Sequence, residues 1–81
     1  SQQLGFRQYQ VLYYLCLGYT NQRIAAALNL HTNTVNYHIR FIKEVLGVQS
    51  RAEIAGKAAA CGLFTPGSPP PQETDGTSNA N

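Results

Sequence analysis

The fold is decided by NQRIAAALNLHTNTVNYHIRFIKEVLG, residues 21–47, which has the pattern of two helices separated by a short joint. In its second half the apolar residues recur at steps of four, three and four, which places them on one side of an α-helix. These residues are Val35, Ile39, Ile42 and Leu46. Gly47 follows the last of them, and glycine readily takes the left-handed conformation that ends a helix. The pattern predicts a helix over about residues 33–46.

A shorter helix is predicted immediately upstream, over about residues 21–28, with Thr20 as its N-cap. Its inward side would carry Ile24, Ala25 and Leu28. Asn29 tolerates the left-handed conformation better than most residues, so the helix can end at the joint NLHT, residues 29–32. Two short helices joined at such a corner have the layout of a helix-turn-helix.

Two further helices are predicted on either side of this pair. One runs over about residues 7–17 and stops at Gly18, and its inner stripe is Val11, Leu12 and Leu15, with Leu4 at its entry. The other begins at SRAE, where Ser50 and Glu53 predict a reciprocal capping box, and it ends before Gly62. No segment alternates with period two, so the predicted fold class is all-α with four helices.

The chain changes character after Phe64. All four prolines follow this point, and residues 65–81 contain no large apolar side chain that could offset the entropy of ordering. We therefore expect a domain over residues 1–64 and a disordered tail over residues 65–81. Residues 1–64 hold six basic and two acidic side chains, a net charge of +4, which suits an anionic partner but is also common on inert domains.

Several classes of protein are not expected. No apolar run approaches the roughly 18 residues of a membrane span, and no signal-peptide pattern opens the chain, so we expect a cytoplasmic protein. Cys16 and Cys61 are expected to be buried or half-buried thiols, with a disulfide or redox pair as the alternative. No catalytic pair or phosphate loop is evident, and His31 and His38 lack further ligands at suitable spacing. We expect no enzyme, cofactor or metal site.

The stretch GYTNQRIAAALNLHTNTVNYHIRFIKEVLGVQSRAEI, residues 18–54, resembles the LuxR-type, or GerE-type, helix-turn-helix. The most specific parts are Thr20-Asn21 before Ile24-Ala25, Thr34-Val35 with His38, and Leu46-Gly47-Val48 before Arg51 and Glu53. The resemblance implies the four-helix DNA-binding domain of a bacterial transcription regulator. It also implies a regulatory domain on the N-terminal side of the complete protein.

With this resemblance, the polar side of residues 33–46 is predicted to read base edges in the major groove of double-stranded DNA. The candidate readers are Asn33, Asn36, Tyr37 and Arg40. Arginine can pair with guanine and asparagine with adenine. The family usually has lysine at the position of Asn36. From the chemistry of the residues alone, a solvated polar face is the alternative.

Phosphate contacts are predicted at helix starts, where free N–H groups and the helix dipole favour anions, and at nearby cations. The candidates are Thr20, Asn21, Arg23, Thr32, Thr34, Lys43 and Arg51. Simple N-capping is the alternative at the helix starts, and an ordinary solvated charge is the alternative for Lys43 and Arg51. His38 lies beside the apolar stripe and is expected to be structural.

The fourth helix is rich in alanine, and the resemblance implies a homodimer contact there. The candidates are Ile54, Ala58 and Cys61, although the same residues fit a role in the core of one chain. The predicted function is sequence-specific binding of double-stranded DNA by a transcription regulator. The alternative is the same scaffold serving as a protein-interaction module, because the third helix carries little charge.

Overall fold

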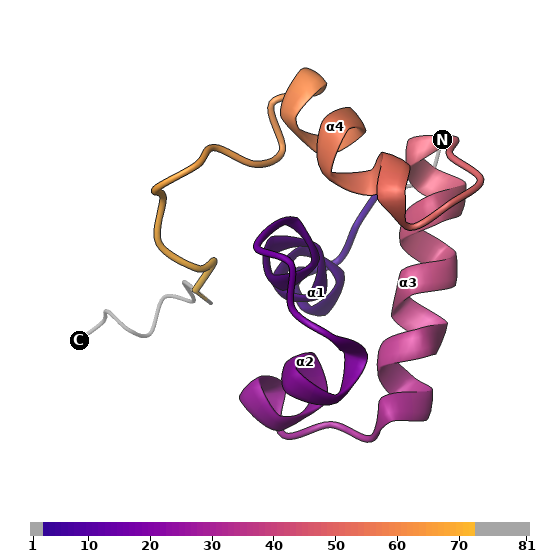
Figure 1. Cartoon of the computed structure of the whole chain (residues 1–81), viewed down its shortest axis with the longest axis vertical. Coiled ribbons are helices and arrows are strands. Elements are labelled where there is room, and N and C mark those ends of the chain that lie inside the picture. The colour runs from indigo at the N-terminus through magenta and orange to yellow at the C-terminus, as the bar shows by residue number, and fades with distance from the viewer. Residues whose placement is uncertain (1–2, 73–81) are drawn as a thin grey trace.

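The computed structural model describes residues 3–72, and its regular structure is entirely helical. The four helices are α1 (Phe6–Cys16), α2 (Asn21–Leu28), α3 (Thr32–Leu46) and α4 (Ala52–Ala60), and no strand occurs among the described residues (Figure 1). The predicted all-α fold class is confirmed. The predicted ranges of the helices differ from the observed ones only at their ends, where helix boundaries are least defined.

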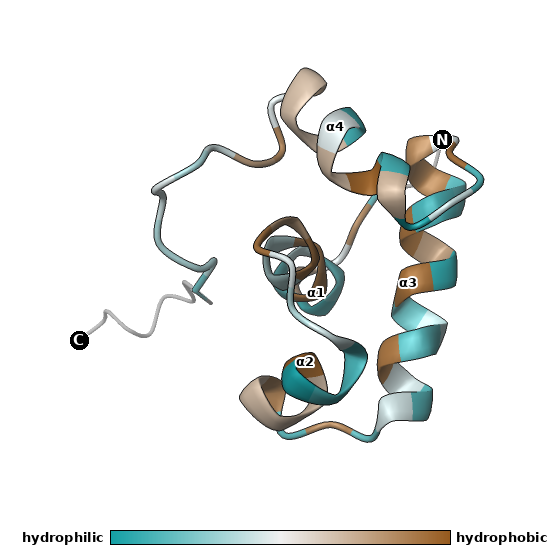
Figure 2. Cartoon of the chain, in the orientation of Figure 1, coloured by the Kyte–Doolittle hydropathy of each residue, from teal (hydrophilic) through white to brown (hydrophobic). Residues whose placement is uncertain are grey.

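Helix α1 lies at the centre of the domain and is flanked by α2, α3 and α4 (Figure 1). Each of the four helices contributes apolar side chains to a single core. Its buried members are Leu4, Val11, Leu12, Leu15, Ile24, Ala25, Val35, Ile39, Ile42, Leu46, Ile54 and Ala58. On α3 the hydrophobic positions face the interior and the hydrophilic positions face away from it (Figure 2). Burial of these stripes therefore fixes how each helix is rotated about its axis.

The corner between α2 and α3 is made at Asn29, which has the left-handed backbone angles φ 58° and ψ 48°. The N–H of Leu30 donates to the carbonyl of Ala25 at 2.8 Å, which closes the last turn of α2. At the start of the same helix, the Arg23 N–H donates to the Thr20 hydroxyl at 3.2 Å. The N-cap and the left-handed stop predicted for this helix are both present.

The predicted capping box of α4 is only half formed. The N–H groups of Gln49 and Ser50 both donate to Glu53 Oε1 at 2.9 Å, and the Ser50 hydroxyl donates to the same oxygen at 3.1 Å. The Glu53 N–H instead donates to the Ser50 carbonyl, and the N-cap residue is Arg51. These bonds lower the pKa of the Glu53 carboxyl, chiefly through the backbone N–H groups of Gln49 and Ser50.

The chain beyond Phe64 passes beside α1 (Figure 1). Residues 65–72 contain no helix or strand, but the Tyr13 hydroxyl donates to the Ser68 carbonyl at 3.0 Å, and Ser68 and Pro71 are half-buried. A cavity of about 170 Å³ lies between this segment and Tyr9 and Tyr13. Proline rings and a backbone carbonyl make this contact, so a search for large apolar residues does not find it. The rest of the predicted tail, residues 73–81, lies outside the described residues.

The two cysteines differ from the expectation in part. Cys16 is half-buried, and burial raises the pKa of its thiol. Cys61 is exposed and directly follows the last residue of α4. Neither forms a disulfide. Over residues 3–72 no helix has the length and apolarity needed to cross a membrane.

The core position Ile42 gives a direct test of this packing. Its side chain is fully buried, so Ile42→Ala should lower the free energy of unfolding by about 2–5 kcal/mol, from lost apolar burial and the cavity left behind. Leu17 is 46% exposed, and Leu17→Ala should cost far less. Urea denaturation followed by circular dichroism measures both. Equal losses in the two variants would contradict the assigned core.

Candidate nucleic-acid interface

The side of α3 opposite its buried stripe carries Asn33, Asn36, Tyr37 and Arg40, and all four side chains are exposed. We call these four residues the outer face of α3. Tyr37 is 57% exposed, an unusual degree for a large aromatic side chain. Helix α3 has 15 residues and is therefore about 22 Å long. Within residues 3–72 no other helix covers this side (Figure 1), so the outer face of α3 is open to contact with a large partner.

The starts of α2 and α3 also reach the surface. Thr20 and Thr32 are exposed, whereas Asn21 and Thr34 are half-buried. The N-cap of α3, His31, makes no side-chain hydrogen bond to the first turn of the helix. Unsatisfied N–H groups at a helix start attract anions. This end of α3 therefore has the chemistry of the predicted phosphate contacts.

Arg51, Asn21 and Asn36 form one hydrogen-bonded chain that links the N-cap of α4 to α2 and α3. Arg51 Nη2 donates to the Tyr19 carbonyl at 2.6 Å, and Arg51 Nη1 donates to Asn21 Oδ1. Asn21 Nδ2 then donates to Asn36 Oδ1 at 2.5 Å. Sequence reasoning named all three as separate DNA contacts and missed their connection, since Arg51 and Asn21 lie 30 residues apart.

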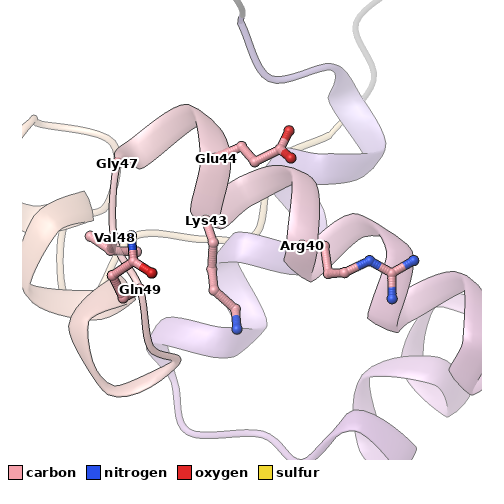
Figure 3. Close-up of a pocket in the computed structure, with 6 residues that line it drawn as sticks. All are labelled: Arg40, Lys43, Glu44, Gly47, Val48 and Gln49. Carbon is pink, nitrogen blue, oxygen red and sulfur yellow. The ribbon is translucent and has the colours of Figure 1, made fainter.

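Two other predicted phosphate contacts lie next to this chain and along α3. The guanidinium of Arg23 sits 4.1 Å from the centroid of the Tyr19 ring, a cation–π contact that orients an exposed cation. Lys43 is half-buried and lines an open groove of about 430 Å³ that extends from Arg40 to the turn after α3. Lys43 and Glu44 point away from one another in this groove (Figure 3).

His38 is held by Gln8 from α1. The Gly5 N–H donates to Gln8 Oε1 at 2.8 Å, so the amide nitrogen of Gln8 must be the atom that faces His38 Nδ1, also at 2.8 Å. An amide nitrogen only donates, so His38 Nδ1 accepts and the imidazole is neutral with its proton on Nε2. Burial, with a contribution from the charge of Arg7, lowers the pKa of His38. The structural role expected for His38 agrees with this arrangement.

The predicted dimer residues divide between core and surface. Ile54 and Ala58 are 1% and 0% exposed, so they belong to the core of the single chain and cannot also meet a partner in this conformation. Cys61 is exposed. The exposed side of α4 instead carries Ala55, Gly56 and Ala59, whose small side chains the sequence analysis did not select.

In a comparison with known protein families, residues 2–58 match the bacterial regulatory proteins of the luxR family. The matched range includes α1, α2, α3 and most of α4. No curated protein and no solved structure matches the chain. The family match confirms the resemblance inferred from the sequence.

Stability should depend on pH through His38. The pKa of His38 is lowered in the folded state. The stabilisation that neutral His38 gives the folded state is therefore fully present above the ordinary histidine pKa of about 6.5. As the pH falls below that value the unfolded chain binds a proton first, and stability declines until the pH passes the lowered pKa. Urea denaturation between about pH 5 and pH 8 measures this decline.

A matched pair of variants identifies the histidine responsible. His38→Gln should remove this part of the decline, because no group with a lowered pKa remains at that position. His31→Gln, at the exposed N-cap of α3, should retain it. Loss of the decline in the His31 variant rather than the His38 variant would refute the assignment.

Proposed function

The chain belongs to the luxR family of bacterial regulatory proteins, and on that premise we propose that it binds double-stranded DNA sequence-specifically as a transcription regulator. The observation that carries the proposal is the outer face of α3, whose four polar or aromatic side chains are exposed opposite a fully apolar stripe. An α-helix fits the major groove of B-DNA, where side chains from one side of the helix reach base edges.

Arg40 is the strongest base-reading residue on this face. Its side chain is exposed and makes no hydrogen bond to any residue in the range 3–72. A free guanidinium can donate to guanine O6 and N7 together, the commonest specific contact in the major groove. Tyr37, one residue before the half-buried His38, can pack on a thymine methyl group or reach a phosphate.

The phosphate contacts would come from the helix starts and from cations outside the outer face of α3. Arg23 stands on Tyr19 near the start of α2, and Lys43 lines the groove at the other end of α3. The exposed hydroxyls of Thr20 and Thr32 mark the two helix starts. Because α3 carries only Arg40 and Lys43 as cations, sequence-independent binding should be weak and should fall further with added salt.

The location and assembly of the protein are part of the same proposal. A DNA partner in a bacterial cell lies in the cytoplasm. A homodimer would form through the exposed side of α4, where Ala55, Gly56 and Ala59 permit close approach of a second helix. A regulatory domain on the N-terminal side would complete the protein.

Sedimentation equilibrium of the wild type and Ala59→Glu tests the dimer, since a buried carboxylate would favour the monomer.

One observation supports a different partner. Tyr37 is more than half exposed on a face with little charge, and exposed tyrosine is common in protein–protein interfaces. An NMR titration separates the two candidates. Shifts at Asn33, Asn36, Tyr37 and Arg40 on addition of duplex DNA support DNA binding, whereas shifts that require a protein partner support an interaction module.

Arg40→Ala tests the DNA proposal most directly. Selection of bound sequences from a random duplex pool first defines the preferred site, and fluorescence anisotropy then measures affinity. The substitution should weaken binding to that site by about 1–3 kcal/mol and relax the preference at one base pair.

Lys57→Ala is the matched control. It removes the same charge from the exposed surface of α4, and it should leave the base preference unchanged. Uniformly negligible binding of the wild type to every duplex at low salt would refute the proposed function.

A further inference from the structure

The hydrogen bonds that connect Arg51, Asn21 and Asn36 fix the orientation of two side-chain amides. A guanidinium can only donate hydrogen bonds, so the amide atom of Asn21 that faces Arg51 must be its oxygen. The other amide atom of Asn21 is then a nitrogen, which donates to Asn36 at 2.5 Å. The atom of Asn36 that receives this bond must be Oδ1. Because the guanidinium can only donate, it fixes the donor and the acceptor in each of these hydrogen bonds.

Both the guanidinium of Arg51 and the backbone turn that carries it are held by hydrogen bonds. Its Nη2 donates to the Tyr19 carbonyl at 2.6 Å, immediately before the N-cap of α2. The turn that precedes Arg51 is closed by the bonds from Gln49 and Ser50 to Glu53. Arg51 therefore starts the chain from an anchored position, and its orientation is passed to Asn36 on α3.

This arrangement determines what Asn36 offers to a partner. Asn36 Oδ1 faces Asn21 and already accepts one hydrogen bond, whereas Asn36 Nδ2 donates to no residue in the range 3–72 and the side chain is exposed. Rotation of the amide by half a turn would bring two nitrogens together, so Asn21 resists it. Asn36 thus presents donors outward.

We propose that Arg51 and Asn21 are positioning residues that make Asn36 read guanine. The inference rests on the proposed DNA-binding function. Guanine shows two acceptors in the major groove, O6 and N7, and both can be met by the free hydrogens of Asn36 Nδ2. Adenine pairs with asparagine only if Oδ1 also accepts from N6, and in this protein that oxygen is shared with Asn21.

This reading replaces two simpler roles for the same residues. Asparagine on a recognition helix would ordinarily be matched to adenine. Arg51 would ordinarily be a phosphate contact, yet two of its N–H groups are used inside the protein. A positioning residue and a phosphate contact have different signatures. Loss of a phosphate contact lowers the slope of log K against log salt by about 1, whereas loss of a positioning residue changes base preference.

Asn21→Asp reverses the hydrogen bond between positions 21 and 36 with little change in the shape of the side chain. A carboxylate at this position still accepts from Arg51 but cannot donate to Asn36. The amide of Asn36 must then turn its nitrogen toward α2 and its oxygen outward. The preferred base should change from guanine to one with an exposed donor, adenine or cytosine, and affinity for the original site should fall roughly tenfold beyond the effect of the added charge.

Gln22→Glu supplies the matched control, because it adds the same charge to the neighbouring exposed position of α2. It should weaken all sites to a similar extent and leave the base preference unchanged. Arg51→Met is a second variant that keeps the length of the side chain but removes the donors. In this variant Asn36 should bind guanine and adenine about equally. The slope of log K against log salt should stay that of the wild type.

Selection from a random duplex pool is carried out with the wild type, these three variants and Asn36→Ala, after circular dichroism has shown that each is folded. The base pair whose preference is lost in Asn36→Ala is the one to follow. Guanine at that base pair in the wild type, replaced in Asn21→Asp and relaxed in Arg51→Met, supports the inference.

Three results overturn it. The first is an unchanged base preference in both Asn21→Asp and Arg51→Met, and the second is a preference for adenine in the wild type. The third is a loss of about 1 in the salt slope of Arg51→Met with the base preference intact. Selective binding by the wild type in any of these cases leaves the proposed function standing. Absence of selective binding by the wild type removes both.

Discussion

The burial of one side of α3 against α1 is the constraint on which the rest of the domain depends. Val35, Ile39, Ile42 and Leu46 are all at most 6% exposed, and together they leave α3 a single rotation about its axis. That rotation places Asn36 and Arg40 on the side of α3 that faces away from the core. The exposed face is therefore a product of core packing, and its rigidity comes from the apolar side of the same helix.

Two sets of hydrogen bonds orient polar side chains on α3, and both work in the same way. In each case a group that can only donate starts a chain of amides and so removes the ambiguity of the amide. A backbone N–H at Gly5 orients Gln8, which sets the tautomer of His38, and the guanidinium of Arg51 orients Asn21, which sets the amide of Asn36. Both chains end on α3, one at its inner edge and one on its outer face.

Periodicity and helix-ending residues were enough to predict the four helices, the core stripe of α3 and the exposed set Asn33, Asn36, Tyr37 and Arg40, because these depend on contacts between near neighbours in sequence. The same reasoning left Ile54 and Ala58 open between a partner contact and the core of one chain, and the structure buries both, since an alanine-rich helix gives little sign of which side is buried. It expected a full capping box at Ser50, where the hydroxyl instead donates to Glu53. The links from Arg51 to Asn21 and from Tyr13 to Ser68 were beyond its reach, because they join residues brought together only by the tertiary fold.

The chain of bonds from Arg51 to Asn36 also bears on how such a domain can change its target during evolution. Lysine, which the family usually carries at the position of Asn36, has donors only and cannot accept from Asn21 Nδ2. A lysine there would compete with Arg51 for the single oxygen of Asn21, so the three positions are coupled, and substitutions at them should be non-additive. Under the proposed recognition, a substitution in α2 or at the start of α4 would change the base preference of Asn36 through hydrogen bonds inside the protein.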